Sequence, residues 1–179
     1  LLLMELLTNL LSKDFIDLAP AEDPSQVGAD EGISAADVCL YGLNILMPLM
    51  SVELLRFPSL CLQYFKTITL VCELYPDKIC ALNPDLQKNL IASLEVGLTQ
   101  SLGMSDTVYS LCCDFIQVLS RHLYVLCVVK RQIPGSASLS PETISMFEGL
   151  RPFLKLMMDL ILSQKINSDL LANASSTLY

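Results

Sequence analysis

The chain has 179 residues, of which 53% are hydrophobic, and its formal net charge is −8. This charge disfavours nucleic-acid binding, which needs clustered lysine and arginine to neutralise phosphates. The uncharged stretch in the most apolar region, residues 38–52, has 15 residues and includes Asn44 and Pro48. A membrane-spanning helix needs about 20 apolar residues, so we expect no membrane insertion.

The first half of the chain predicts three helices and one long connection. Residues 1–13 predict a helix, and residues 14–33 form an acidic connection with prolines and glycines but no apolar periodicity. Residues 34–76 predict two helices folded back on each other, with a break at Phe57 because the residue before a proline avoids the helical conformation. The first of these two helices is apolar nearly all round, through Val38, Tyr41, Ile45 and Leu49 on one stripe and Leu40, Leu43, Leu46 and Met47 around it. Such a helix must be covered on two sides.

The second half predicts two further helix pairs, over residues 84–130 and 141–179. Asn83 and Ser140 each precede a proline, which is the usual combination of an N-cap and a first helical residue. The helix after Asn83 carries leucines four residues apart and should close at Gly103. Ser105 or Asp106 should begin the next helix, which reaches about Lys130. The helix after Ser140 should reach about Gln164, and a last helix should begin at Asn167 or Ser168.

The predicted helix starts form two interleaved series, with a spacing of roughly 50 to 60 residues in each, slightly above the period of HEAT and armadillo repeats. Stacked pairs of antiparallel helices at such a period are typical of an α-solenoid. We therefore predict an all-α fold, an α-solenoid of HEAT-like helix pairs. An ordinary helical bundle is the alternative. The lack of polar capping helices further predicts a fragment of a longer solenoid.

The negative charge is concentrated in one segment. Residues 14–55 contain no lysine or arginine and eight acidic residues, whereas acidic and basic residues balance elsewhere. We expect Asp23, Asp30 and Glu31 to attract a basic protein surface and to act mainly on the association rate. The alternative interpretation is that this connection is only a solvated linker.

No pattern of catalytic or metal-ligating residues stands out. The seven cysteines include no CxxC pair, and most have apolar neighbours, which fits a reducing compartment and a packing role. His122 is the only histidine, and its place on the apolar stripe of its helix favours a core residue. We therefore expect no enzyme activity, cofactor or metal. An enzyme would have to depend on His122.

Several long stretches resemble a known family. MELLTNLLSKDFID, SAADVCLYGLNILMPLM, LLRFPSLCLQYFKTITLVCELYPDKI and DLQKNLIASLEVGLTQ are similar to the C-terminal part of nuclear export receptors of the karyopherin-β (importin-β) superfamily. A weaker likeness continues through SDTVYSLCCDFI and RPFLKLMMDLILSQKIN. The acidic connection after Asp17 and the loop RQIPGSASLSPE do not share it.

The resemblance implies a HEAT solenoid that binds protein cargo together with the small GTPase Ran in its GTP form. Such a receptor contacts nucleoporins and shuttles between nucleus and cytoplasm through the nuclear pore. The resemblance points to a hypusine-bearing translation factor or Smad-type transcription regulators as cargo. It transfers no binding residue, because contacts in this family are spread over many repeats. A HEAT-repeat scaffold or adaptor subunit of a non-transport complex is the alternative.

Overall fold

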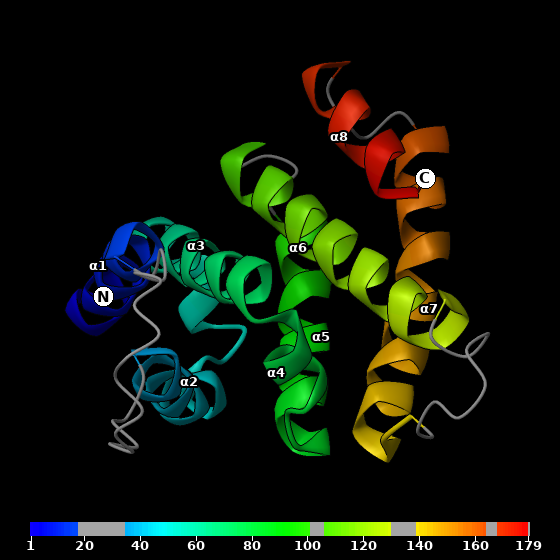
Figure 1. Ribbon diagram of the computed structural model, residues 1–179. Helices are drawn as coiled ribbons and strands as arrows, with labels where there is room; N and C mark the ends of the chain where they lie inside the picture. Colours follow the sequence, from blue (N-terminus) through cyan, green and yellow to red (C-terminus); the bar gives the residue numbers. More distant parts are fainter. Residues whose placement is uncertain (18–34, 101–105, 130–138, 164–167, 179) are drawn as a thin grey trace.

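The computed structural model describes residues 1–17, 35–100, 106–129, 139–163 and 168–178 (Figure 1). These residues form helices and the turns between them, with no strand in any of the five segments. The prediction of an all-α protein is confirmed.

The first helix is longer than predicted. Helix α1 (Leu2–Asp17) continues past Lys13 into the segment that we assigned to the acidic connection. Residues 14–17 contain no proline or glycine, and the first helix breaker is Pro20. Nothing in this sequence therefore stops the helix at Lys13.

The segment 34–76 begins and breaks where the sequence predicts. Helix α2 (Ala35–Leu46) ends in a tighter 3₁₀ turn, η1 (Met47–Leu49), at Pro48, which has no backbone N–H for the helical ladder. A second 3₁₀ turn, η2 (Leu54–Arg56), leads to Phe57, whose φ of −81° and ψ of 112° are extended. Helix α3 (Pro58–Leu74) follows, and Pro76 begins a short helix, α4 (Pro76–Cys80), that we did not predict.

The packing of α2 and α3 differs from the simple hairpin that we expected. Helix α2 packs mainly on α1, whereas α3 packs on α1 and more extensively on α6, and α2 and α3 have little direct contact with each other. Gly42 in α2 allows this approach, because a Cβ atom there would lie 3.1 Å from the Leu7 methyl groups of α1. Helix α1 therefore connects α2 and α3 by packing against both of them.

The later helix starts follow their predicted caps. Helix α5 (Pro84–Gln100) begins with the Leu86 N–H donating to Asn83 Oδ1 at 2.9 Å. Helix α6 (Asp106–Tyr124) continues as one π-helical stretch, η3 (Val125–Val129). Helix α7 (Pro141–Leu162) begins with the Thr143 N–H donating to Ser140 Oγ at 3.2 Å, and α8 (Ser168–Leu178) comes last. The predicted helix end at Gly103 lies outside the described residues.

The helices form two rows. In the first row, α1, α3, α6 and α8 pack side by side in this order, and the α3–α6 and α6–α8 contacts are the most extensive (Figure 1). In the second row, α2 reaches α5 through η1, and α5 packs on α7. Contacts of α1 with α2, α5 with α6, and α7 with both α6 and α8 join the rows. The two predicted series of helix starts correspond to these two rows.

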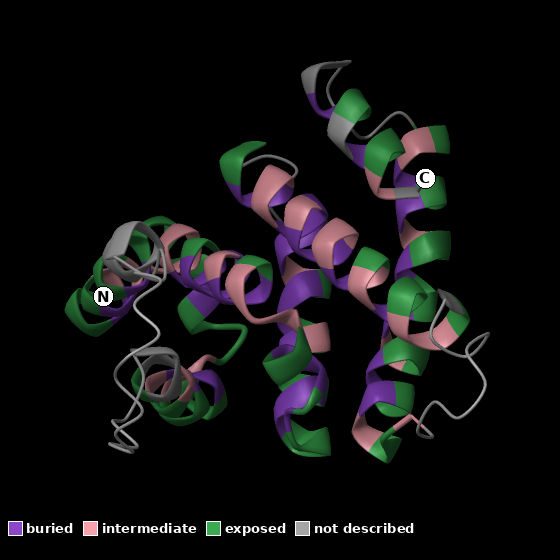
Figure 2. Ribbon diagram, viewed as in Figure 1, coloured by how far each residue is buried: buried purple, intermediate pink, exposed green. Residues whose placement is uncertain are grey.

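The core lies between the rows (Figure 2). Phe65 of α3 is completely buried, and its ring lies over Gly97 of α5, where a Cβ atom would be 2.7 Å from Phe65 Cζ. The apolar stripes predict that Phe65 and Leu46 both lie between the two helices of segment 34–76 or against the next helix pair. Leu46 is half-buried and packs against the core. The predicted leucine stripe of α5 is buried, as are Val108, Cys112, Phe115 and Leu119 on the apolar side of α6.

A few polar contacts fix neighbouring helices. Thr8 Oγ1 of α1 lies 2.9 Å from Thr67 Oγ1 of α3. The Gln87 side chain of α5 donates through Nε2 to the carbonyl oxygens of Cys80 at 3.2 Å and Glu142 at 3.0 Å. Gln87 therefore ties α5 to α4 and to the first turn of α7.

Within the described residues, one stretch is long and apolar enough to cross a membrane by length and composition, Asp106–Val128. The helix α6 in this stretch packs on α3, α5 and α8. The core helix of a soluble protein passes the same test. This stretch is therefore weak evidence for a membrane span.

Candidate functional site

The three residues that we expected to bind a partner, Asp23, Asp30 and Glu31, lie outside the described residues. Their role stays a prediction. The described part of the chain offers other surfaces on which a function can be built.

Among the described cysteine side chains, Cys72, Cys80, Cys112 and Cys113 are buried, as expected of packing residues. Burial raises the pKa of the Cys80 thiol to about 12 and that of Cys113 to about 11, and it raises the pKa of Cys112 well above its usual value. Thiols are reactive as thiolates, and a raised pKa keeps them protonated. No group of three or more His, Cys, Asp and Glu side chains in the described segments is arranged to hold a metal ion.

His122, which we expected in the core, is half-buried on α6, and its Nε2 atom is shielded from solvent. It lies near the end of this helix, two residues before Tyr124, which is exposed. No cluster of Cys, Asp or Glu with metal-holding geometry surrounds it in the described part of the chain.

Two carboxylates lie close together where α3 packs on α6. The pKa of Glu73 is raised by partial burial and by the neighbouring charge of Asp114, whose own pKa is raised by partial burial. Neither carboxylate forms a salt bridge with a described residue. This pair makes the surface of the first row locally acidic.

The side of α2 that we predicted as its apolar stripe faces solvent. Leu43 and Met47 are buried instead, on the opposite side of the helix, and Tyr41 is 69% exposed. The neighbouring helix α1 also exposes leucines. Together they form what we name the first end face, which consists of Leu2, Leu3, Leu6 and Leu10 of α1 with Val38, Tyr41, Ile45 and Leu49 at the α2–η1 segment.

A second group of exposed apolar residues lies at the other end of the rows, on α7, where Figure 2 marks exposed positions along the helix. Its residues are spaced so that one side of the helix carries them, and Leu154 is 61% exposed. We name it the second end face, which consists of Ile144, Phe147, Leu154, Met158 and Leu162. The sequence shows these apolar residues, but periodicity alone does not reveal which of two apolar sides a neighbour covers.

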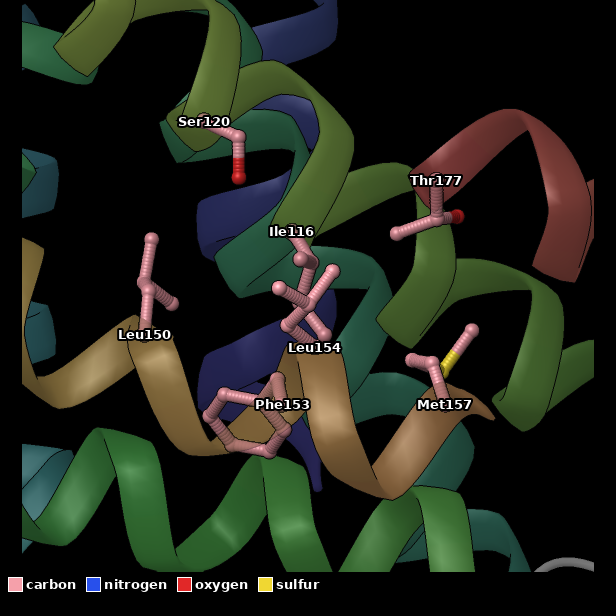
Figure 3. Close-up of a pocket in the computed structure, with 7 residues that line it drawn as sticks. All are labelled: Ile116, Ser120, Leu150, Phe153, Leu154, Met157 and Thr177. Atoms are coloured by element: carbon pink, nitrogen blue, oxygen red, sulfur yellow. The ribbon is translucent and has the colours of Figure 1, made fainter. Parts of the chain in front are cut away.

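A small pocket lies next to the second end face, between α6, α7 and α8 (Figure 3). Its volume is about 80 Å³. The lining is apolar except for two hydroxyl side chains, and it consists of Ile116, Ser120, Leu150, Phe153, Leu154, Met157 and Thr177. Small-molecule sites usually have volumes of roughly 300–1,000 Å³, so this pocket suits at most a single apolar side chain.

A comparison with models of known protein families gives no match to this chain. The two end faces are apolar, and exposed apolar patches of this size are typical of sites that contact another surface.

Proposed function

We propose that this chain is a segment of an α-solenoid of HEAT-like helix pairs. The observation that carries the proposal is the order of the helices, because each of the two rows continues in one direction without closing on itself. In an ordinary four-helix bundle the helices surround one common core. The segment then consists of the end of one repeat, the acidic connection, and the pairs over residues 34–76, 84–130 and 141–179.

We further propose that the solenoid belongs to a nuclear export receptor of the karyopherin-β superfamily. The support is the resemblance of long stretches of sequence, which lie mostly within α1, α2, α3 and α5. The receptor binds Ran-GTP and a protein cargo, either a hypusine-bearing translation factor or a Smad-type regulator. It contacts nucleoporins and moves between nucleus and cytoplasm.

A pulldown with Ran tests the transport role. The full-length protein is immobilised and incubated with Ran locked in the GTP state or loaded with GDP, with each candidate cargo present or absent. Retention of Ran-GTP that increases with cargo, and no retention of Ran-GDP, is the expected result. Equal retention of both Ran forms, or of neither, would leave a HEAT scaffold or adaptor subunit as the better interpretation.

A further inference from the structure

An exposed serine stands directly before the proline that begins α7. We propose that Ser140 is a phosphorylation site for a proline-directed protein kinase, and that the phosphate strengthens the first turn of α7. Ser140 and Pro141 form the one pair in the 179-residue sequence in which a serine or threonine precedes a proline. Phosphorylation at this position depends on neither Ran nor cargo, so its absence would leave the transport proposal standing.

The backbone at Ser140 already has an extended shape. Its φ of −66° and ψ of 150° lie outside the helical region, because a residue before proline avoids that region. Pro141 is exposed and is the first residue of α7, where its missing N–H costs no hydrogen bond. A kinase that selects a proline after the acceptor can therefore reach both residues from solvent.

The Ser140 hydroxyl is accessible, whereas the next hydroxyl along the chain is not. Ser140 is exposed, and Thr143 is only 8% exposed. The Thr143 N–H donates to Ser140 Oγ at 3.2 Å, and the two hydroxyl oxygens lie 3.0 Å apart. Both contacts stay within one helical turn, so the Ser140 side chain can rotate toward solvent without separating any pair of helices.

Other exposed hydroxyl groups lack this setting. Thr99 and Ser175 are also exposed, but each lies inside a helix and donates its hydroxyl to a carbonyl oxygen of the same helix. Neither is followed by proline. The extended backbone and the exposed proline ring therefore distinguish Ser140 from these two residues.

The modification is a phosphoryl transfer from ATP held by the kinase. The Ser140 hydroxyl oxygen forms a bond to the γ-phosphorus, and the bond from that phosphorus to the bridging oxygen of ADP breaks. The hydroxyl proton passes to the catalytic carboxylate of the kinase. The products are phosphoserine at position 140 and ADP.

A phosphate at this position favours the helix that follows. It adds about two negative charges and three acceptor oxygens, and it lies where the first N–H groups of α7 have no carbonyl partner within the helix. Glu142 on the same turn repels it, but solvent screens this repulsion between side chains. Charge-assisted bonds from backbone N–H groups, such as that of Thr143, are direct and outweigh it.

The first turn of α7 also connects this helix to its neighbours. The Gln87 side chain donates to the carbonyl oxygen of Glu142 at 3.0 Å and to that of Cys80 at 3.2 Å. A more stable first turn therefore holds the carbonyl group on which this link between α4, α5 and α7 depends.

A kinase assay with matched proline variants tests the site. The full-length protein is incubated with ATP, Mg²⁺ and a purified proline-directed kinase of the mitogen-activated type, and mass spectrometry locates the phosphate. Pro141→Ala keeps the acceptor and removes the proline that the kinase selects. Pro84→Ala, at the exposed first position of α5, is the matched control. Circular dichroism checks that both variants keep their fold.

The unaltered protein and Pro84→Ala should incorporate phosphate on Ser140 at the same rate, and Pro141→Ala should do so severalfold more slowly. Ser140→Ala should carry none at this position. No phosphate on Ser140 of the unaltered protein, or equal rates in Pro141→Ala, would overturn the assignment of the site.

Hydrogen–deuterium exchange tests the effect on α7. The amides of the first turn, including those of Thr143 and Ile144, should exchange severalfold more slowly in the phosphorylated protein, because the phosphate stabilises this turn. The amides in the middle of α3 should exchange at the same rate in both forms. Equal or faster exchange at the start of α7 after phosphorylation would overturn the strengthening of this helix.

Discussion

At the scale of single residues, α3, α5 and α6 approach one another closely around Gly97. The Phe65 ring and the Cys112 sulfur both lie against Gly97, which leaves no room for a side chain at this position. All three residues are buried. The position of Phe65 on an apolar helical stripe predicts its burial, but nothing in the sequence indicates that Gly97 lies beneath its ring.

Phe65→Ala should lower the free energy of unfolding by about 3–5 kcal/mol, because it removes a fully buried aromatic side chain. Lys66→Ala, at the next position and exposed, should change it by less than about 0.5 kcal/mol. Urea unfolding of the two variants measures both values. Similar losses at the two positions would contradict the described orientation of α3.

Gly97→Ala should destabilise the protein by about 1–3 kcal/mol through overpacking. Its new Cβ atom would lie 2.5 Å from Cys112 Sγ and 2.7 Å from Phe65 Cζ. The double variant Gly97→Ala with Cys112→Ala should recover part of this loss, because the second change removes the sulfur. Thermal unfolding followed by circular dichroism compares the variants. A fully stable Gly97→Ala protein would show that these helices lie farther apart.

The buried thiols predict a loss of stability at alkaline pH. Burial raises the pKa of Cys80 from 9.0 to about 12 and that of Cys113 to about 11. The unfolded chain therefore loses these protons at a lower pH than the folded chain. Their contribution is fully present below pH 9 and is lost as the pH rises toward 11 and 12.

Urea unfolding at about pH 7.5 and about pH 10.5 measures this effect. The free energy of unfolding should fall between the two values, and it should fall less in a Cys80→Ala, Cys113→Ala variant. An equal fall in both proteins would assign the pH dependence to other groups.

At the scale of helices, local sequence signals account for most boundaries. Asn83 and Ser140 cap their helices as predicted, and Phe57 takes the extended conformation that the following proline requires. The misassigned end of the first helix lacks such a signal, because no breaker follows Lys13 and α1 continues. Helix α3 ends just before Pro76, as the proline predicts, and Pro76 then begins α4, a short helix that we did not predict.

The acidic connection gives a prediction at this scale. Changing Asp23, Asp30 and Glu31 to Asn, Asn and Gln in the full-length protein should slow association with a basic partner severalfold at low salt. Charges at the rim of an interface act mainly on the association rate, and salt screens them over about 8 Å at physiological ionic strength. Stopped-flow association measured across salt concentrations tests this. Equal rates for both proteins at low salt would favour a solvated linker.

At the scale of the whole molecule, the sequence predicted the alternation of helices and their two series, which correspond to the two rows. It did not predict that α2 and α3 both pack on α1, because side-chain periodicity does not specify which neighbour covers an apolar face. For the same reason, the sequence could not show which apolar residues form the two end faces and which form the core. Their residues have the same spacing as buried ones, and only the packed structure distinguishes them.

The central proposal is that the two rows are part of a longer solenoid that carries cargo with Ran-GTP. Electron cryo-microscopy of the full-length protein bound to Ran-GTP and cargo tests it most directly. We predict that α1, α3, α6 and α8 lie in one continuous layer with further helices of the chain, that α2, α5 and α7 lie in the second layer, and that Ran and cargo contact the solenoid. Residues 1–179 forming a closed bundle that packs on no other helix pair would contradict the account.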